Sequence, residues 1–270
     1  MTTMTPIATR PVISKHIGLG TTLRNTLTMA YRALLKIKHT PDQLVDVMLQ
    51  PILFTLMFAF IFGGAIAGSM GDYLPTLIPG ILAQTVIMAS VTTGVSMRED
   101  MEKGVFNRFK SLPIARIAPL AGALITDFVR YAIAISLTFL MGFILGYFPA
   151  AGALWILGAG LLAMLTAWCM SWIFAWLGLI MRTAQSVSGL SMMILMPLTF
   201  LSNAFVPVDT LPWFLQGFVG VNPVSHLVAA MREMLNFGII GADFWWTLVG
   251  LAAIVAIFAP LTLRAYKRTA

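Results

Sequence analysis

The sequence predicts an all-α integral membrane protein with six transmembrane helices. Of its 270 residues, 59% are hydrophobic and only 10% are charged, whereas an average soluble domain carries about 25% charged residues. Six apolar stretches are each near or above the roughly 20 residues that a helix needs to cross a bilayer. In this arrangement only Arg130 and Arg232 fall outside the side that collects the other Lys and Arg residues. The positive-inside rule makes that side cytoplasmic and predicts that both termini lie there, whereas five or seven spans would divide the cations.

Composition also limits which classes of function the chain can have. The formal net charge is +7, but the cations cluster beside apolar runs, which indicates membrane orientation and argues against a nucleic-acid partner. The single cysteine, Cys169, lies in an apolar run and can form no disulfide within the chain. The first apolar run begins only near Leu44, behind a polar tail, so we expect no cleavable signal peptide.

The N-terminal region predicts a tail followed by a surface helix. Residues 1–20 are rich in Thr, and we expect a loose cytoplasmic tail. Within residues 21–39, apolar side chains recur at spacings of three or four positions, with Arg and Lys between them: Leu23, Leu27, Ala30, Leu34 and Ile37. A basic amphipathic helix of this kind lies in the membrane interface. An ordinary solvated helix is the alternative, which the nearness of the first span disfavours.

The chain is expected to form a single transmembrane domain, 1–270. The predicted spans are residues 47–65, 77–95, 122–148, 154–181, 187–206 and 245–263. Pro51 and Pro79 fall in the opening turns of the first two spans, where a missing N–H costs least. The turns that follow the first and third spans carry no Lys or Arg, as expected on the outer side.

Residues 98–120 form the longest charged segment within the chain and connect the second and third spans. Each unpaired charge would cost about 2.5–3.5 kcal/mol in hydrocarbon, so the segment must lie in water. Apolar side chains fall largely on one face of the expected helix, although Glu102 interrupts that face: Met101, Val105, Phe106, Phe109 and Leu112. Pro113 ends the helical pattern. Periodicity alone leaves two interpretations, a docking helix for a partner protein and a charged loop that only fixes topology.

Residues 207–244 are too apolar for a plain loop. Residues 211–218 and 224–237 predict two short helices, broken at Asn222–Pro223. Both are too short to cross, so we expect them to enter the outer leaflet and return, or to lie along it, with Arg232 and Glu233 on a polar edge.

Two of these segments resemble a known family. Residues 100–116, DMEKGVFNRFKSLPIAR, are similar to the cytoplasmic signature between the second and third spans of type-2 ABC exporter permeases, closest to the daunorubicin-resistance group. Residues 222–232, NPVSHLVAAMR, resemble the same group, and the likeness covers nearly the whole chain in span order. It implies a half-transporter in the bacterial cytoplasmic (inner) membrane. Two copies, or this chain with a paralogue, would bind two cytoplasmic ATPase subunits.

The resemblance also implies roles for residues. It identifies 98–120 as the cytoplasmic coupling segment, in which six residues would transmit motion from the ATPase: Glu99, Glu102, Gly104, Phe106, Arg108 and Phe109. It identifies the 21–39 helix as an elbow helix that helps to hold the ATPase, and residues 207–244 as the cap of the outer exit.

We expect no catalysis in this chain. A phosphate-binding loop needs GxxxxGK[ST], and no lysine here follows a glycine, so ATP and Mg²⁺ belong to the partner subunit. The three histidines are scattered without HExxH or CxxC, which predicts no metal site. No other cofactor is expected.

Asp127 and Arg130 stand three residues apart on one face of the third span, toward its cytoplasmic end. One interpretation is a gate or lateral-entry contact. We favour the other, a mutually neutralised structural pair whose side chains extend to the interface.

The second and fifth spans carry scattered polar residues and methionines. Small hydroxyl residues commonly bridge packed helices, which explains most of them. A sharper hypothesis is that these two spans line the seam between two protomers and the translocation path, where methionine gives an adaptable apolar wall. The candidate residues are Gln84, Ser188, Ser191, Met192, Met196 and Thr199.

The sequence therefore predicts the permease subunit of an ATP-driven exporter that moves a small amphipathic, drug-like or lipid-like molecule outward through the membrane lipids. A polysaccharide or glycolipid exporter is the alternative within the family. A gradient-driven carrier would need ionisable residues at mid-bilayer and inverted repeats. A lipid-modifying enzyme would need a cluster of carboxylates or histidines. The sequence leaves open the cargo, the direction of transport, the identity of the ATPase, and whether the dimer holds one kind of permease or two.

Overall fold

The computed structural model describes residues 28, 31, 41–105, 118–205, 208 and 212–269. The predicted tail, nearly all of the 21–39 helix and residues 106–117 of the charged segment lie outside these ranges. The described part is helical, with no strand within it, and its elements in chain order are α2 (Pro41–Ala67), α3 (Met70–Glu102), α5 (Ala118–Ile144), α6 (Ala153–Ile180), α7 (Ala184–Phe200), α8 (Trp213–Val221), α9 (Pro223–Phe237) and α10 (Ala242–Thr269).

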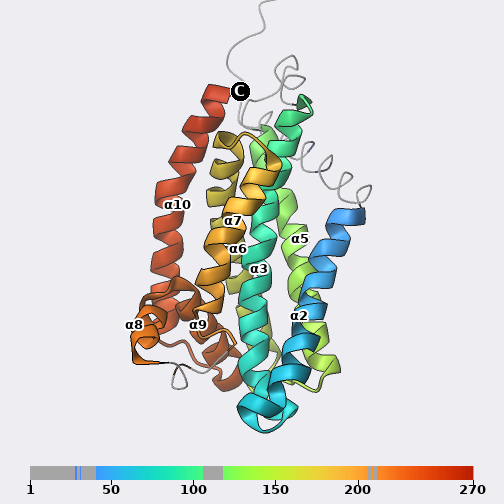
Figure 1. Ribbon diagram of the computed structural model, residues 1–270, viewed down its shortest axis with the longest axis vertical. Helices are drawn as coiled ribbons and strands as arrows, with labels where there is room; N and C mark the ends of the chain where they lie inside the picture. Colours follow the sequence, from blue (N-terminus) through green and yellow to red (C-terminus); the bar gives the residue numbers. More distant parts are fainter. Residues whose placement is uncertain are drawn as a thin grey trace, which may run out of the picture.

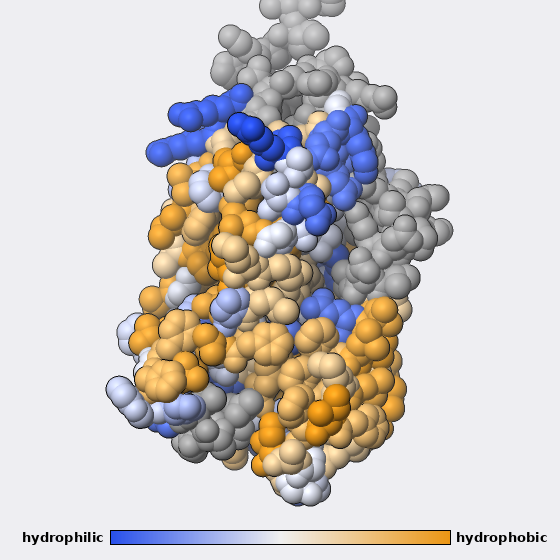
Figure 2. Space-filling view, viewed as in Figure 1, coloured by the Kyte–Doolittle hydropathy of each residue, from blue (hydrophilic) through white to orange (hydrophobic). Residues whose placement is uncertain are grey.

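The long helices run side by side along the length of the molecule, and α8 and α9 lie across one end of it (Figure 1). The opposite end, here called the basic end, carries the cations that close α3 and α10: Arg98, Lys103, Arg264, Lys267 and Arg268. Between the two ends, the face in view is dominated by apolar side chains (Figure 2). This distribution fits a bundle whose middle lies in hydrocarbon.

Five described helices are long and apolar enough to cross a membrane: Met48–Ala67, Met70–Glu102, Leu120–Ile144, Ala153–Ile180 and Ala242–Arg268. The pair α8 and α9, bent by 79° at Asn222, would bring the number to six if it counts as one broken span. The expected break at Asn222–Pro223 is therefore present, because Asn222 both ends α8 and caps α9.

The fifth predicted span, 187–206, is shorter than expected. Helix α7 has 17 residues and ends at Phe200, so it extends for about 25 Å at 1.5 Å per residue. Pro197 lies inside its last turn. Two of the backbone carbonyls beyond it accept hydrogen bonds from outside the helix, since Asn222 Nδ2 donates to the oxygens of Leu198 and Leu201. The chain turns at that point instead of continuing the helix.

Helix α3 is the centre of the bundle and packs against α2, α5, α6, α7 and α9. Its crossing with α6 is close because two glycines meet there. A Cβ atom on Gly94 would lie 2.1 Å from the backbone oxygen of Phe174, and one on Gly178 would lie 2.4 Å from that of Gly94. Small residues allow helix backbones to approach in this way, which fixes the register of α3 against α6.

Polar side chains of α9 point inward to the first turns of α3. Pro79 has no N–H to offer the carbonyl of Pro75, and Asn236 Nδ2 donates to that oxygen instead, at 3.0 Å. Arg232 Nη2 donates to the backbone oxygens of Thr76, at 3.2 Å, and Asn203, at 2.9 Å. The expectation that Arg232 marks a polar outer edge is therefore wrong. Unpaired backbone groups cost several kcal/mol away from water, and α9 supplies their partners.

Candidate functional site

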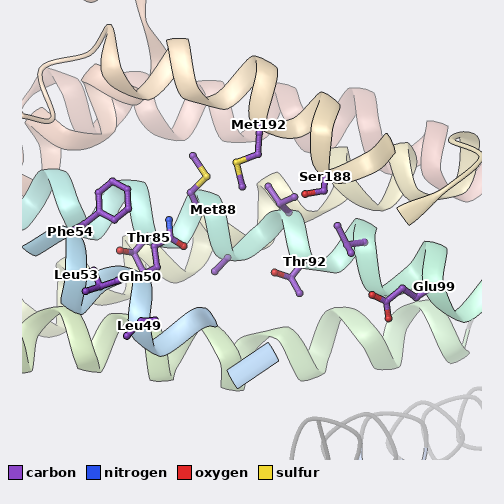
Figure 3. A pocket seen from close by; sticks show the side chains of 13 residues that line it. Leu49, Gln50, Leu53, Phe54, Thr85, Met88, Thr92, Glu99, Ser188 and Met192 are labelled. Carbon is purple, nitrogen blue, oxygen red and sulfur yellow. The ribbon is translucent and has the colours of Figure 1, made fainter. Parts of the chain in front are cut away.

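A groove of about 540 Å³ lies between α2, α3 and α7. Helix α3 contributes its floor and the other two helices contribute walls: Leu49, Gln50, Leu53 and Phe54 from α2, Thr85, Met88, Ala89, Val91, Thr92, Val95 and Glu99 from α3, and Ser188 and Met192 from α7. Figure 3 shows the side chains of Met88 and Met192 pointing toward one another, with Glu99 at the far end of the groove.

The groove combines apolar walls with polar groups that have no partner in the described part of the chain. The side chains of Gln50, Thr85, Thr92 and Ser188 make no hydrogen bond to any described residue. A surface of this kind suits an amphipathic guest, because apolar area drives binding and a few available donors and acceptors orient the ligand. Methionine side chains adapt to guests of several shapes.

At the basic end, the last residue of α3 contacts the first residue of α7. The backbone N–H of Ala184 donates to Glu102 Oε1 at 2.9 Å, and Arg98 Nε lies 3.4 Å from the same oxygen. Thr183 is the N-cap of α7, so Glu102 satisfies a further N–H in the first turn. A carboxylate there also complements the positive end of the helix dipole. This contact joins the described part of the charged segment to a wall of the groove.

Two other residues of the predicted coupling set are described. Glu99 pairs with Lys103 at 3.2 Å and also lines the groove, a position that the sequence did not suggest. Gly104 follows the end of α3 with a φ of +67°, which favours glycine. Phe106, Arg108 and Phe109 lie outside the described residues, so their expected role is untouched by the structure.

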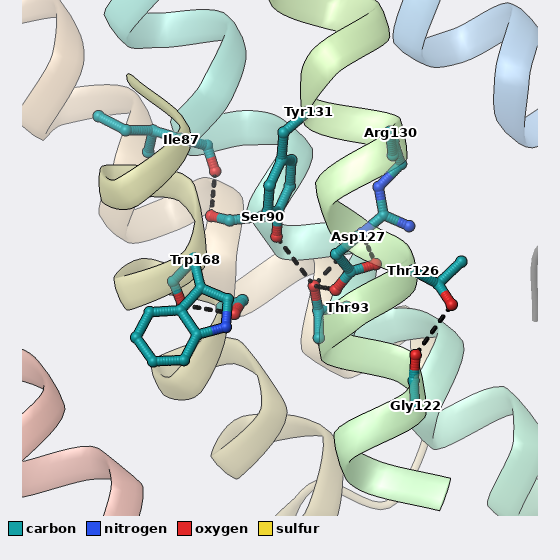
Figure 4. A network of polar contacts seen from close by, with 10 residues as sticks. Ile87, Ser90, Thr93, Gly122, Thr126, Asp127, Arg130, Tyr131 and Trp168 are labelled. Carbon is teal, nitrogen blue, oxygen red and sulfur yellow. Dashed lines mark hydrogen bonds and ion pairs between the residues drawn. The ribbon is translucent and has the colours of Figure 1, made fainter. Parts of the chain in front are cut away.

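Asp127 and Arg130 are buried between α5 and α3 and do not extend to the interface, contrary to expectation. Asp127 Oδ1 lies 2.6 Å from Arg130 Nη2, and the two side chains are 7% and 6% exposed. The Thr93 hydroxyl donates to Asp127 Oδ2, and Arg130 Nη2 lies 3.3 Å from Thr93 Oγ1 (Figure 4). The pair therefore holds α5 against α3. Its partner on α3, Thr93, is next to the groove residue Thr92.

The predicted seam residues divide among several places. Ser188 and Met192 line the groove. Gln84 and Thr199 are buried inside the protomer, at 2% and 0% exposure, and neither lines the groove. Met196 is exposed on α7 outside the groove, and Ser191 faces a different cavity.

Sequence reasoning missed the wall that α2 contributes, and it missed the contact between Glu102 and Ala184. Gln50 was the available signal for α2, since it is the larger of two polar side chains, with Thr55, within an otherwise apolar predicted span. No signal marked the second contact, because its partners stand 82 residues apart and one of them is a backbone N–H. Within the described ranges, no three His, Cys, Asp or Glu side chains are placed to hold a metal ion.

The sequence matches known transport proteins over most of its length. The family described as ABC-2 type transporter matches residues 24–236. The daunorubicin resistance ABC transporter permease protein DrrB1 of Streptomyces coeruleorubidus is 43% identical over 253 residues, which are 92% of this chain and 88% of that protein. The probable doxorubicin resistance ABC transporter permease protein DrrC of Mycobacterium tuberculosis is 24% identical, over 90% of this chain and 88% of its own. The inner membrane transport permease YadH of Escherichia coli K12 is 24% identical, over 74% and 77%.

Proposed function

The chain belongs to the ABC-2 type transporter family, as its two motifs predicted, and it is a permease subunit; we propose that it exports an amphipathic, drug-like or lipid-like molecule. The observation that carries this proposal is the connection from Glu102 through α7 to the groove. It joins a surface suited to an amphipathic cargo to a segment that another protein can push.

The finer topology follows from charge. The basic end faces the cytoplasm, because Lys and Arg gather there and the positive-inside rule applies to short loops. Helix α7 acts as the fifth of six spans, and the bent α8 and α9 pair lies at the outer leaflet. Both termini are then cytoplasmic, and the protein is an inner-membrane protein of a bacterium.

A second permease, either another copy or a paralogue, completes the groove. Large apolar side chains stand exposed on the two walls and outside them, including Leu53 and Phe60 on α2 and Met193 and Met196 on α7. Lipid-facing helices are also apolar, so association is inferred from the groove itself: its polar groups are costly against hydrocarbon, and a second permease would cover them. We therefore place the proposed seam on α2 and α7, with α3 as its floor. The first span, α2, thus takes the place that the sequence predicted for the second span.

Two ATPase subunits drive the cycle from the cytoplasm. Closure of the ATPase dimer displaces residues 98–120, and with them the end of α3 moves. Glu102 carries this displacement to Ala184, so α7 shifts against α3 and the groove changes its width. The chain contributes mechanical coupling and a path, while the ATP chemistry stays in the partner.

Reconstitution tests the proposal. The permease is purified from membranes together with any roughly 30-kDa P-loop protein that accompanies it, and both are placed in vesicles loaded with ATP and Mg²⁺. We expect ATP-dependent movement of daunorubicin across the vesicle membrane, followed by its fluorescence, and no movement with ADP. Movement by the permease alone under an ion gradient would contradict the proposal.

A further inference from the structure

A second cavity, of about 240 Å³, lies on the neighbouring face of α7 from the groove. It is bounded by α6, α7, α9 and α10, which contribute, among others, Met170, Leu198, Leu227 and Ile254, and α3 contributes Ile87. Helices α7 and α10 pack against α6 rather than against each other, so the cavity opens between them. The walls of this opening belong to the apolar middle of the bundle.

The hydroxyl groups of this cavity are already used. Ser191 donates to the backbone oxygen of Val187 at 2.7 Å, and Thr166 donates to that of Leu162 at 2.9 Å. Thr247 donates to the oxygen of Asp243 at 2.8 Å. Each bond stays within its own helix, so these side chains offer no donor to a guest. The cavity therefore suits hydrocarbon, apart from the indole N–H of Trp246, which has no hydrogen-bond partner among the described residues.

The cavity is deep enough to hold a large part of one lipid chain. Its lining on α10 runs from Trp246 to Ile254, which corresponds to roughly 12 Å along the helix. Trp245 and Trp246 stand exposed in the first two turns of α10, and tryptophan prefers the boundary between headgroups and hydrocarbon. The cavity thus begins at the interface and extends toward the middle of the bilayer, in the direction that an acyl chain takes.

We propose that this cavity binds one acyl chain of a membrane phospholipid, with the glycerol end beside Trp246 and the methyl end toward Met170. The bilayer reaches the opening from the side, because the exposed face of α10 carries Val249 and Ile257. Apolar cavities of this kind stay dry and are filled by apolar guests. The lipid chain occupies the space that α7 would enter if it moved toward α10.

This position gives the lipid a mechanical role. That role rests on the proposed function, whereas the binding of the lipid chain does not depend on it. Helix α7 is a wall of both spaces, with Ser188 and Met192 facing the groove and Ser191 facing the cavity. A chain seated on one side limits how far α7 can withdraw from the other. Occupancy of the cavity then restricts the width of the groove.

Photolabelling tests the binding. The protein is reconstituted in vesicles of phosphatidylglycerol that carries a diazirine near the middle of one acyl chain, illuminated, and mapped by peptide mass spectrometry. On α10, the exposed face at Ala253 and Ile257 meets the bulk bilayer and should be labelled, and we expect adducts on the cavity face, at Gly250 and Ile254, as well. Labelling confined to the exposed face would overturn the proposal, as would crosslinks from the cavity positions to a second permease.

A cavity-filling substitution gives the matched comparison. Gly250 lines the cavity, and a Cβ atom there meets no atom within 4 Å, so Gly250→Phe fills the space without a backbone clash. Ala253→Phe adds the same ring to an exposed position of the same helix. We expect Gly250→Phe to reduce adducts on Ile194 and Ile254 at least fivefold and Ala253→Phe to leave them unchanged. Unreduced labelling in Gly250→Phe would contradict the site, and the wild-type map decides alone if that variant does not fold.

Discussion

The groove and the cavity lie on neighbouring faces of the same short helix, α7. They differ in whether their hydroxyl groups have hydrogen-bond partners. In the groove, the Ser188 hydroxyl has no partner among the described residues. In the cavity, three positions along α7, the Ser191 hydroxyl is bonded to Val187. Residue type alone does not distinguish a surface that binds a polar guest from a cavity that binds hydrocarbon. The state of each polar group does, because only an available donor or acceptor can orient a polar guest.

The largest effect should come from cutting the link that moves α7. The double change Glu102→Ala with Phe106→Ala removes the carboxylate that accepts from Ala184 and an apolar residue of the expected coupling face. We expect loss of ATP-dependent transport and of cargo-stimulated ATPase activity, measured in vesicles, with membrane insertion intact.

Lys267→Ala is the control for this pair, since Lys267 lies at the same basic end, is exposed and, unlike Lys103, makes no ion pair with a groove residue in the described part of the chain. Its transport should stay near that of the parent. Normal efflux in the double variant would show that the groove is driven from elsewhere.

The next effect concerns stability. Asp127→Asn leaves Arg130 buried without its carboxylate, and breaking one side of a buried pair costs about 3–5 kcal/mol. The free energy of unfolding in detergent should fall by that order. The double change Asp127→Leu with Arg130→Met should recover part of the loss.

Val129→Ala, at an exposed position of the same helix, provides the reference for the pair. An Asp127→Asn protein as stable as this reference would mean that the pair does not hold α5 to α3.

A smaller effect separates the two regions directly. Thr92→Val removes a groove hydroxyl while it keeps the shape, and one lost hydrogen bond of about 0.5–1.5 kcal/mol should weaken cargo binding roughly two- to tenfold. Thr247→Val makes the same change in the cavity, where the hydroxyl serves only its own helix. Its cargo affinity should match that of the parent, as measured by fluorescence titration with daunorubicin. Equal losses in both variants would remove the distinction between the two regions.

The protomer seam gives a yes-or-no result. Met192→Cys in a Cys169→Ser background places one thiol on α7 at the edge of the groove. We expect a disulfide between two permease chains in native membranes, detected on a non-reducing gel. Ala253→Cys on α10 should form none. Failure of Met192→Cys to crosslink, with the partner ATPase present, would place the seam on other helices.

Much of the bundle could be predicted because its signals are local. Apolar length gave the long helices, and Asn222–Pro223 gave the break between α8 and α9, since Asn caps a helix and Pro suits its first turn. Charge asymmetry separated the two ends. Helix α7 was predicted too long, because its end depends on Asn222, which reaches back from 21 residues away to bond Leu201.

The site was less predictable, since its geometry depends on tertiary contacts. Arg232 reads as a surface cation in the sequence, yet the carbonyls that accept from it belong to α3 and to the turn after α7. Gln84 and Ser188 are both polar residues in apolar helices, but only the packing of α2 and α7 on α3 decides which one reaches the groove. Burial that is decided by packing between helices leaves no periodic pattern in the sequence.

The central claim is that Glu102 transmits motion from the charged segment to the groove wall. Leu53→Cys and Met192→Cys place one thiol on each wall, in a Cys169→Ser chain assembled with its ATPase. The rate at which these two thiols form a disulfide within one chain, which a non-reducing gel separates from the disulfide between the Met192→Cys positions of two chains, reports the groove width with and without a non-hydrolysable ATP analogue. We predict a clear nucleotide-dependent change in that rate, and its loss when Glu102→Ala is added. The same nucleotide-dependent change with and without Glu102 would contradict the account.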